Sequence, residues 1–590
     1  MRRKSALWIV VSGILFSIIL AGCNGEGESD SEGSGAEGQT EEIDLNEEVQ
    51  NDGEIIEDGS LTYGLVSDSP FEGILNSAFL AAAPDGQVVQ FFDEALLAVN
   101  KDFEITNDGA ATFEMSDDNK TITIQIKDNV NWHDGEPVKA EDLQFAYEVI
   151  GSPEYVGSHY GSLIQMVEGM DAYNSGEADE ISGIEIIDEK TLSITYTKAS
   201  PAILNGIWST PLPKHYLGDI SVPDIPSSKE VRENPIGFGP FKVDRIVAGE
   251  SVQYSRNDDY WKGKPKLASI TLKIVNPNTV LQSLENGEVD IAETFPTDQY
   301  PNAADGENYQ IIGGINNSYT YLSFKLGHYD TEKKENVMDR PKLQNKDLRK
   351  AMGYALDMEQ IAENFYHGLS FPATTLIVPF FEGYHDETIE GFPYNVEKAE
   401  ELLDEAGYVD VDGDGYREDP DGEEFIINFL ARSGSDTSEP MAKYFIQSWN
   451  DIGLNVELVD GRLHEFNSFN KMVDDDEQKV DVFISGWGVG TDVDPSGIYG
   501  RKMPYNNSRF VSEENDELLE AALSEEAFDT ERRKEIYNEW QAYMYEESPV
   551  IPILYSYKLL GVNNRVKDYS FDTTIFGTWE EVGVTEETAE

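Results

Sequence analysis

One stretch of the sequence carries more structural information than its neighbours: Trp132-His133-Asp134-Gly135-Glu136-Pro137-Val138-Lys139-Ala140-Glu141-Asp142-Leu143. Asp134-Gly135 is a turn pair, and apolar side chains recur at helical spacing over 139–150 directly after it. Two acidic residues lie in the first turn of this helix, where the helix dipole favours them. The stretch therefore predicts a turn that leads into a helix, with His133 packed or hydrogen-bonded at the turn and not acting as a metal ligand.

Segments on both sides of this stretch alternate between strand and helix patterns. Strands are predicted at 61–66, 121–126, 191–196, 269–274, 425–429 and 480–484. Further helices are predicted at 346–357, 395–406, 440–452 and 530–546. The fold class is therefore mixed α/β without an internal repeat, and a length of 590 residues suggests two or three domains.

The N-terminus has the pattern of a bacterial lipoprotein signal. Three basic residues precede an apolar run at 6–19 that is too short to anchor a chain across a bilayer. The run leads to Leu20-Ala21-Gly22-Cys23, where small residues before a cysteine match a lipoprotein cleavage site. We therefore predict a signal peptide at 1–22 and a lipid on the thiol of Cys23. The alternative is an uncleaved membrane helix that ends in cysteine by chance.

The chain is strongly acidic, with 113 Asp and Glu against 43 Lys and Arg and a net charge of −70 at pH 7. Such a field repels nucleic acid, which is therefore not an expected partner. We interpret the acidity as a solvated surface screened by salt. Residues 23–55 add few large apolar side chains to this charge and are predicted as a disordered acidic tether. With Cys23 lipidated, the sequence has no thiol left for a disulfide.

Six segments, of which 132–143 is the first, follow one another along the chain. After 132–143 come Gly237-Phe238-Gly239-Pro240-Phe241-Lys242-Val243, Asn257-Asp258-Asp259-Tyr260-Trp261, Asn286-Gly287-Glu288-Val289-Asp290-Ile291, Leu348-Arg349-Lys350-Ala351-Met352-Gly353-Tyr354-Ala355-Leu356-Asp357 and Tyr394-Asn395-Val396-Glu397-Lys398-Ala399. In this order they resemble the peptide/nickel class, family 5, of the bacterial extracellular solute-binding proteins of ABC importers, and in particular the oligopeptide-binding lipoproteins. The resemblance extends over nearly everything after Ser60.

The resemblance implies an α/β fold of the two-lobed periplasmic-binding-protein type, class II, with an extra subdomain inserted in the first lobe. Crossing strands would join the lobes, which close around ligand like a hinge. The implied domains are lobe I at 56–80, 197–315 and 549–590, the inserted subdomain at 81–196, and lobe II at 316–548.

The most promising ligand segment is Ser485-Gly486-Trp487-Gly488-Val489-Gly490-Thr491-Asp492-Val493-Asp494-Pro495, after the strand predicted to end at Ile484. Its glycines let a ligand backbone approach closely, and Trp487 offers an apolar wall. The resemblance implies that an aspartate of this loop grips the amino terminus of a peptide. Asp492 is the candidate, with Asp494 as the alternative unless Asp494 caps a turn before Pro495. The candidate residues are Gly486, Trp487, Gly488, Val489 and Asp492.

Two other places are candidate contacts. Tyr160 lies in a loop of the inserted subdomain that reaches toward the cleft in this interpretation. Asn316, Asn317 and Tyr319 lie where the chain is expected to cross between the lobes, with polar groups for an extended peptide.

An acidic loop, Asp410-Val411-Asp412-Gly413-Asp414-Gly415, matches the start of an EF-hand calcium loop. Glu418 and Asp421 stand at the ninth and twelfth places. Two features depart from the pattern, because the twelfth place is usually Glu and a strand pattern follows where a second helix belongs. Structural calcium at Asp410, Asp412 and Asp414 is one prediction, and a plain acidic turn is the alternative.

The sequence thus predicts a lipid-anchored protein, on the extracellular face of the cell membrane or in a periplasm, that captures oligopeptides for an ABC permease. Dipeptides, nickel chelates and oligosaccharides are alternative cargoes, although seven scattered histidines argue against a histidine-based metal site. The remote alternative is a secreted hydrolase, but no Gly-x-Ser-x-Gly, His-Glu-x-x-His or phosphate-loop motif is present. We expect a monomer with no catalytic residue and no required cofactor.

Overall fold

The structure is a computed structural model that describes residues 45–80, 82–304, 306–434 and 437–589. The predicted signal peptide, Cys23 and the first part of the predicted tether lie outside these residues. Within the described ranges, no helix is both long enough and apolar enough to cross a bilayer.

One large mixed sheet runs through the described chain in the order β17-β16-β18-β12-β19-β11-β1-β10-β9-β8, and β15 also pairs with β19. Its strands are β1 (Ser60–Val66), β8 (Phe241–Val247), β9 (Ser251–Arg256), β10 (Ser269–Val275), β11 (Ile291–Ala292), β12 (Tyr309–Phe324), β15 (Ser370–Pro372), β16 (Ile426–Leu430), β17 (Asn455–Leu458), β18 (Val482–Gly488) and β19 (Val550–Asn563).

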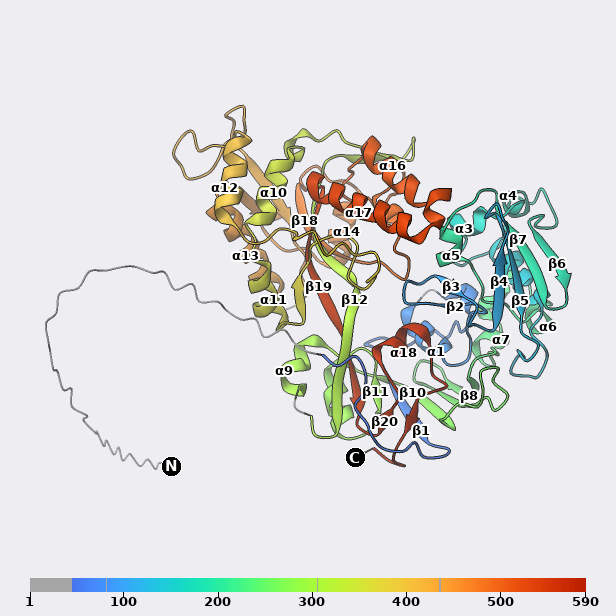
Figure 1. The fold of residues 1–590 in the computed structure, drawn as a ribbon. Coiled ribbons are helices and arrows are strands. Elements are labelled where there is room, and N and C mark those ends of the chain that lie inside the picture. Colours follow the sequence, from blue (N-terminus) through green and yellow to red (C-terminus); the bar gives the residue numbers. More distant parts are fainter. Residues whose placement is uncertain (1–44, 81, 305, 435–436, 590) are drawn as a thin grey trace, which may run out of the picture. The chain divides into compact units, whose positions relative to one another are not determined.

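Two long strands, β12 and β19, lie side by side and join the halves of this sheet (Figure 1). The first half of β12 pairs with the end of β19, which also pairs with β11. The second half of β12 pairs with the start of β19 and with β18. The register between β12 and β19 shifts between Ile315 and Tyr319. The fold is therefore two-lobed, with a first lobe around β1 and β8–β11 and a second lobe around β16–β18.

A separate four-stranded sheet belongs to the N-terminal part of the chain. Its order is β4 (Ala111–Met115), β5 (Thr121–Ile126), β7 (Thr191–Thr195), β6 (Ile184–Asp188). Helix α2 (Ala140–Ile150) packs on it and begins as the sequence predicts, because Asp142 accepts the backbone N–H of Lys139 at 2.9 Å and the indole N–H of Trp132 at 3.1 Å.

His133 is hydrogen-bonded at the turn, which confirms the prediction for this residue. Its Nε2 donates to the carbonyl of Gly239 at 3.0 Å, and the N–H of Gly237 donates to its Nδ1 at 3.3 Å. Burial lowers the pKa of His133 to about 4, so the ring is neutral at pH 7. Two of the six sequence segments are thus joined through one side chain.

Long helices cover the second lobe: α10 (Lys346–Tyr354), α11 (Met358–Tyr366), α12 (Val396–Glu405), α13 (Ser438–Asp451), α14 (Phe466–Asp474) and α17 (Thr530–Glu547). The helix predicted at 346–357 ends three residues early. Asp357 instead caps α11, because its carboxylate accepts the N–H of Gln360 at 2.9 Å. The strand predicted to end at Ile484 continues to Gly488, because its partner β12 pairs with it that far.

The tether predicted for residues 23–55 ends earlier than expected. Val49 donates its N–H to the carbonyl of Tyr569 at 3.0 Å, and the side chain of Asn51 donates to the carbonyl of Asn564 at 2.8 Å. Residues 45–55 are therefore held on the first lobe, and the prediction is wrong for them. Composition missed this because the segment is held largely by backbone and amide hydrogen bonds, and only a few apolar side chains, among them Leu45 and Val49, pack against the cores.

Hydrophobic cores follow the sheets. The core of the four-stranded sheet contains Trp132 and Leu143 and extends to Ile203 and Phe238, beyond the limit of 196 expected for the inserted subdomain. The core of the second lobe contains Ile427, Trp449 and residues of β12 and β19. The domain limits given above stay predictions.

Candidate functional site

A cavity of about 1060 Å³ lies in the second lobe, where β16 and β18 end. Ligands of open α/β sheets bind outside the carboxyl ends of the strands, and small-molecule sites measure about 300–1,000 Å³. Residues at the start of α13 and α14 also line the cavity, and Thr297 and Asp298 of the short helix η4 (Thr297–Gln299) line it from the chain of the first lobe. The cavity is large enough for a ligand of more than drug size.

Aromatic side chains form much of the cavity wall. They are Tyr321, Phe365, Tyr366, Phe429, Phe445, Phe466, Phe469, Trp487 and Tyr505. Of these, the sequence singled out Trp487 alone. Phe445 and Phe469 fall on the buried faces of their helices, so their spacing in the sequence cannot be told from that of ordinary core residues. Phe466, in contrast, is 53% exposed at the first position of α14.

Trp487 is held in place as a wall of the cavity by two neighbouring rings. Its ring lies parallel to that of Tyr321, with 6.5 Å between ring centroids and 6° between planes. The ring of Tyr505 meets it edge-on at 5.8 Å. Trp487 belongs to β18 and pairs in register with Tyr319 of β12, so the sheet fixes its backbone. A side chain fixed in this way presents a rigid apolar surface.

Gly486 and Gly488 flank Trp487 on the exposed end of β18. A Cβ atom added at Gly486 would meet nothing nearer than the carbonyl oxygen of Tyr319 at 3.6 Å, and one added at Gly488 would meet nothing within 4 Å. Neighbouring protein atoms therefore do not require glycine at these positions. Glycine leaves the backbone of this strand end open to close approach by a ligand.

Asp492 and Asp494 lie in the loop after β18, beside a small cavity of about 30 Å³ that Tyr319 and Val489 also line. Burial raises the pKa of Asp494 to about 6, and the negative charge of Asp492 contributes. The pKa of Asp492 is also raised by the surrounding protein, although its side chain is exposed at the surface. The two aspartates differ in the groups from which they accept hydrogen bonds. Asp494 accepts the N–H of Ser496 at 3.0 Å and also its hydroxyl, whereas Asp492 accepts the N–H of Asp494 at 3.0 Å.

Three predicted residues of the crossing strand already have protein partners. The side-chain amide of Asn317 donates to the backbone carbonyl of Gly490 at 2.8 Å. The backbone carbonyl of Asn317 accepts the N–H of Val489 at 2.9 Å. The amide of Asn316 donates to the Ser318 hydroxyl at 3.0 Å. The buried hydroxyl of Tyr319 is 2.6 Å from that of Tyr499. These residues hold the loop of Asp492 in place, and direct contact with ligand stays a prediction.

Tyr160 is not brought to the other candidates. It is half-buried and packs against the core of the four-stranded sheet. It is not among the described residues that line the two cavities above. The sequence placed it in a loop near the cleft, and its role stays a prediction.

Among the described residues that line the large cavity, Arg432 is the one lysine or arginine. It follows β16, and its guanidinium lies over the ring of Phe466 at 5.2 Å from the centroid. Among the described residues it has no ion-pair partner within 4 Å. Asp298 and Asp474 add negative charge to the same cavity, so the wall is polar as well as aromatic.

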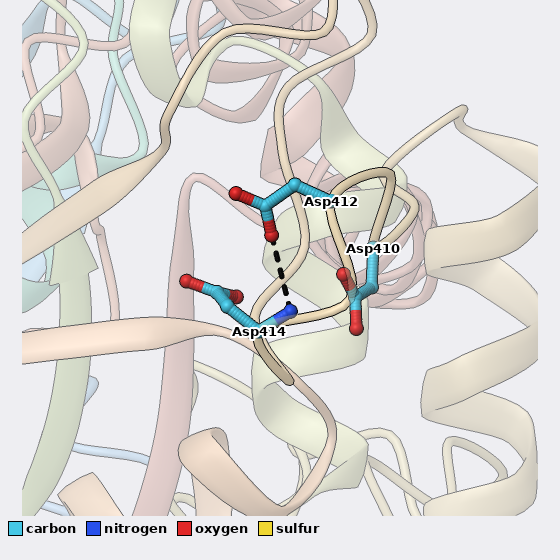
Figure 2. A group of neighbouring side chains, drawn as sticks. All are labelled: Asp410, Asp412 and Asp414. Carbon is cyan, nitrogen blue, oxygen red and sulfur yellow. Dashed lines mark hydrogen bonds between the residues drawn. The ribbon is translucent and has the colours of Figure 1, made fainter.

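The acidic loop of the second lobe brings three carboxylates together, as Figure 2 shows for Asp410, Asp412 and Asp414. One oxygen from each lies within 4.8 Å of the others, and all three residues are exposed. Asp410 also accepts the N–H of Gly413 at 2.6 Å and that of Gly415 at 3.0 Å. Oxygen donors in this arrangement suit calcium. Calcium stays a prediction, since the same bonds stabilise an acidic turn on their own.

Residues 104–509 match the model of the bacterial extracellular solute-binding proteins, family 5. The chain is 31% identical over 536 residues to the oligopeptide-binding protein OppA of Lactococcus lactis subsp. cremoris, covering 88% of each chain. It is 24% identical to the oligopeptide-binding protein AppA of Bacillus subtilis, covering 97% of each.

Solved structures agree with this. Lactococcal OppA, complexed with an endogenous peptide in the closed conformation, matches with a TM-score of 0.72 and 30% identity, over 89% of this chain and all of that one. The six segments of the sequence, the two lobes joined by β12 and β19 and the match over most of the chain lead to one assignment. The chain belongs to the family 5 bacterial extracellular solute-binding proteins.

Proposed function

We propose that this protein captures oligopeptides outside the cell membrane and delivers them to the permease of an ABC importer. The observation that carries the proposal is the cavity of about 1060 Å³, with its aromatic wall beside the glycine-flanked end of β18. A strand end offers backbone hydrogen bonds to any peptide, and a roomy cavity accepts varied side chains. The relatives from Lactococcus lactis and Bacillus subtilis are oligopeptide-binding proteins, which supports this ligand class.

In the proposed binding mode an extended peptide lies along the end of β18, and its α-ammonium pairs with Asp492. Asp492 is preferred to Asp494 because both oxygens of Asp494 are already bonded to Ser496. The other proposed contacts are Gly486, Trp487, Gly488, Val489, Tyr160, Asn316, Asn317 and Tyr319.

Closure of the lobes is the proposed step that follows binding. The register shift between Ile315 and Tyr319 interrupts the β12–β19 ladder between the two half-sheets, and a ladder bends most easily where its bonds are interrupted. A closed, loaded protein presents a different surface from an open one, which lets a permease distinguish them.

The proposed location is the extracellular face of the cell membrane, with a lipid on Cys23, or the periplasm of a cell with two membranes. A monomer is proposed, since one molecule contains the whole cavity. Cell fractionation with Cys23→Ser tests the anchor. Release of the protein into the medium is expected, and retention on the cell would contradict it.

The same role for dipeptides, nickel chelates or oligosaccharides is the alternative. His367 is the one histidine among the described residues that line the large cavity, which gives little support to a histidine-bound metal. Aromatic walls also suit sugars, so cargo has to be decided by binding. A hydrolase is disfavoured, because the family is one of solute-binding proteins.

Titration calorimetry with peptides of increasing length tests the proposal. We expect saturable binding of peptides with a free amino terminus, and weaker binding by Asp492→Ala. Asp179→Ala, at an exposed residue of the other lobe, is the control and should bind as the wild type does. Binding of oligosaccharide or nickel chelate with no response to any peptide would overturn the peptide assignment. Unchanged affinity in Asp492→Ala would remove Asp492 from the site.

A further inference from the structure

A short hairpin of the first lobe has its tip in the core of the second lobe. Strands β2 (Ala98–Val99) and β3 (Ile105–Thr106) form the hairpin. At its base, Leu97 and Ile105 pack in the core around the four-stranded sheet. At its tip, Phe103 is 4% exposed and packs in the core of the second lobe. One hairpin therefore connects two hydrophobic cores.

Three aromatic rings surround Phe103. The rings of Phe380 and Phe576 lie stacked with it, with centroids at 5.2 and 5.9 Å, and that of Phe381 meets it edge-on at 5.7 Å. Phe380 and Phe381 lie in the loop between β15 and α12, and Phe576 ends helix α18 (Phe571–Phe576). An aromatic anchor buried in such a pocket carries much of the energy of an interface.

The backbone conformation at position 103 is unfavourable for a phenylalanine. Its φ is +59°, and the loop is closed by bonds from Asn100 N–H to Glu104 oxygen at 3.0 Å and from Phe103 N–H to Asn100 oxygen at 2.9 Å. The last residue of such a loop is usually glycine, and a bulky residue there is strained. The β4–β5 hairpin shows the ordinary solution, because Asn119 takes its left-handed position with φ +54°. Contact with the second lobe, rather than the hairpin itself, accounts for phenylalanine at 103.

A buried arginine of the second lobe forms a polar contact with the N-terminal part of the chain and lies close to Glu104, the residue after Phe103. Arg533 of α17 is 1% exposed, and its Nη1 donates to Oδ1 of Asn205 at 2.6 Å. Asn205 lies on α5 (Ala202–Gly206), in the N-terminal part of the chain. The same Nη1 is 4.0 Å from Glu104, whose carboxylate also accepts the hydroxyl of Tyr384 at 3.4 Å. Nε and Nη2 of Arg533 have no hydrogen-bond partner among the described residues. The bond to Asn205 exists only while the two lobes are together.

We propose that the tip of the β2–β3 hairpin is a latch that holds the two lobes together, with Phe103 as its anchor and Arg533 as its polar contact. Separation of the lobes would expose the ring of Phe103 and its pocket to water, so the latch favours the closed state before any ligand binds. Ligand then binds to a protein that is already partly closed and dissociates slowly. The proposal rests on the proposed function, because a latch serves a protein that closes on cargo.

The latch also lies near the proposed amine site. The positive charge of Arg533 acts on both Asp492 and Asp494 and lowers their pKa values against the effect of burial. Neutralisation of this loop by a ligand ammonium therefore changes the electrostatic environment of the arginine that contacts the first lobe.

Four variants test the latch. Phe103→Gly removes the ring and relieves the backbone, whereas Phe103→Ala removes the ring and keeps the strained conformation. Phe380→Ala weakens the pocket from the other lobe. Asn119→Gly is the matched control, because it relieves the same backbone conformation in a hairpin whose tip residue is not in the second-lobe core. The measurements are peptide affinity and dissociation rate, together with small-angle X-ray scattering of each unliganded protein.

We expect Phe103→Gly, Phe103→Ala and Phe380→Ala to weaken peptide affinity by about tenfold, because the apparent affinity falls with the closed population. We also expect faster dissociation and a larger radius of gyration without ligand, with Asn119→Gly unchanged. Wild-type affinity, dissociation and scattering in Phe103→Gly would overturn the latch. If the wild type bound no peptide, the proposed function would fail, and scattering of the unliganded variants would still decide on the latch.

Discussion

At the residue scale, two neighbouring aspartates of the proposed site are predicted to make peptide binding sensitive to pH. Burial raises the pKa of Asp494 to about 6, and the pKa of Asp492 is raised as well. An ammonium group binds to the ionised carboxylates and not to the neutral acids. We therefore predict that affinity for a peptide with a free amino terminus falls as pH is lowered from 7.5 to 5. Calorimetry over this range measures it, with the N-acetylated peptide as control. An equal fall for both peptides would contradict the pairing.

Two half-buried carboxyl groups of the first lobe should make stability depend on pH in the opposite sense from a salt-bridged acid. Burial raises the pKa of Asp93 and of Glu94 to about 7. Between about pH 4 and 7 the folded protein holds protons that the unfolded chain releases, so the free energy of unfolding falls as pH rises. We predict a loss of up to about 1.4 kcal/mol per pH unit for each group. Urea unfolding of wild type and Asp93→Asn measures it, and identical slopes would contradict the assignment.

Particular residues show what the sequence reveals of the site and what it does not. Trp487 could be chosen from sequence, because glycines on both sides of a tryptophan after a strand are unusual for a core. Phe445 could not, since a buried aromatic at helical spacing looks the same whether it faces a core or a cavity. Glu94 gave no signal either, because its partners Tyr260 and Trp261 are more than 160 residues away.

At the scale of elements, a substitution at the end of β18 should change peptide affinity without changing the stability of the fold. A side chain at Gly486 has room on the protein side, with the nearest atom at 3.6 Å. We predict that Gly486→Val keeps wild-type stability and weakens peptide affinity by about tenfold or more, which is 1.4 kcal/mol. Gly237→Ala is the contrasting variant, because its Cβ would lie 2.0 Å from the carbonyl oxygen of Phe92. That variant should lose about 1–3 kcal/mol of stability. Full affinity in Gly486→Val would remove this strand end from the site.

The loop between α12 and β16 allows a second test at this scale. If Asp410, Asp412 and Asp414 bind calcium, calcium at 100 times its Kd stabilises the protein by about 2.7 kcal/mol and raises the unfolding midpoint by a few degrees. Differential scanning calorimetry with calcium and with chelator measures this, and Asp412→Asn should abolish it. The same rise in Asp412→Asn would show general screening of an acidic chain.

Elements with strong local signals were predictable, and those set by distant partners were not. Helices α2, α12 and α17 are confirmed, because apolar periodicity and capping lie within each segment. Strand β12 has a run of Gly and Asn in the middle of its sequence and gave no strand pattern. It exists because β19, more than 200 residues later, pairs with it along most of its length. Long-range pairing of this kind leaves no local periodicity.

At the scale of the whole molecule, net charge governs stability. The chain has a net charge of −70, with 113 acidic and 43 basic residues. Repulsion among these charges opposes the compact state and weakens as salt shortens the Debye length from about 30 Å at 0.01 M to 3 Å at 1 M. We predict that the free energy of unfolding rises between low and molar sodium chloride. Denaturation with urea, an uncharged denaturant, measures it, and a flat profile would contradict a screened acidic surface.

The attachment of residues 45–55 to the first lobe determines how mechanical load enters the molecule. Asn46 accepts the N–H of Gly313 of β12 at 3.0 Å, and Val49 donates its N–H to the carbonyl of Tyr569 at 3.0 Å, so a pull on the N-terminal chain acts first on these bonds. Gly313 lies in the half of β12 that pairs with the end of β19, so the load enters this crossing strand on its first-lobe side. With the predicted lipid on Cys23, tension from the membrane would therefore reach the first lobe before the second lobe.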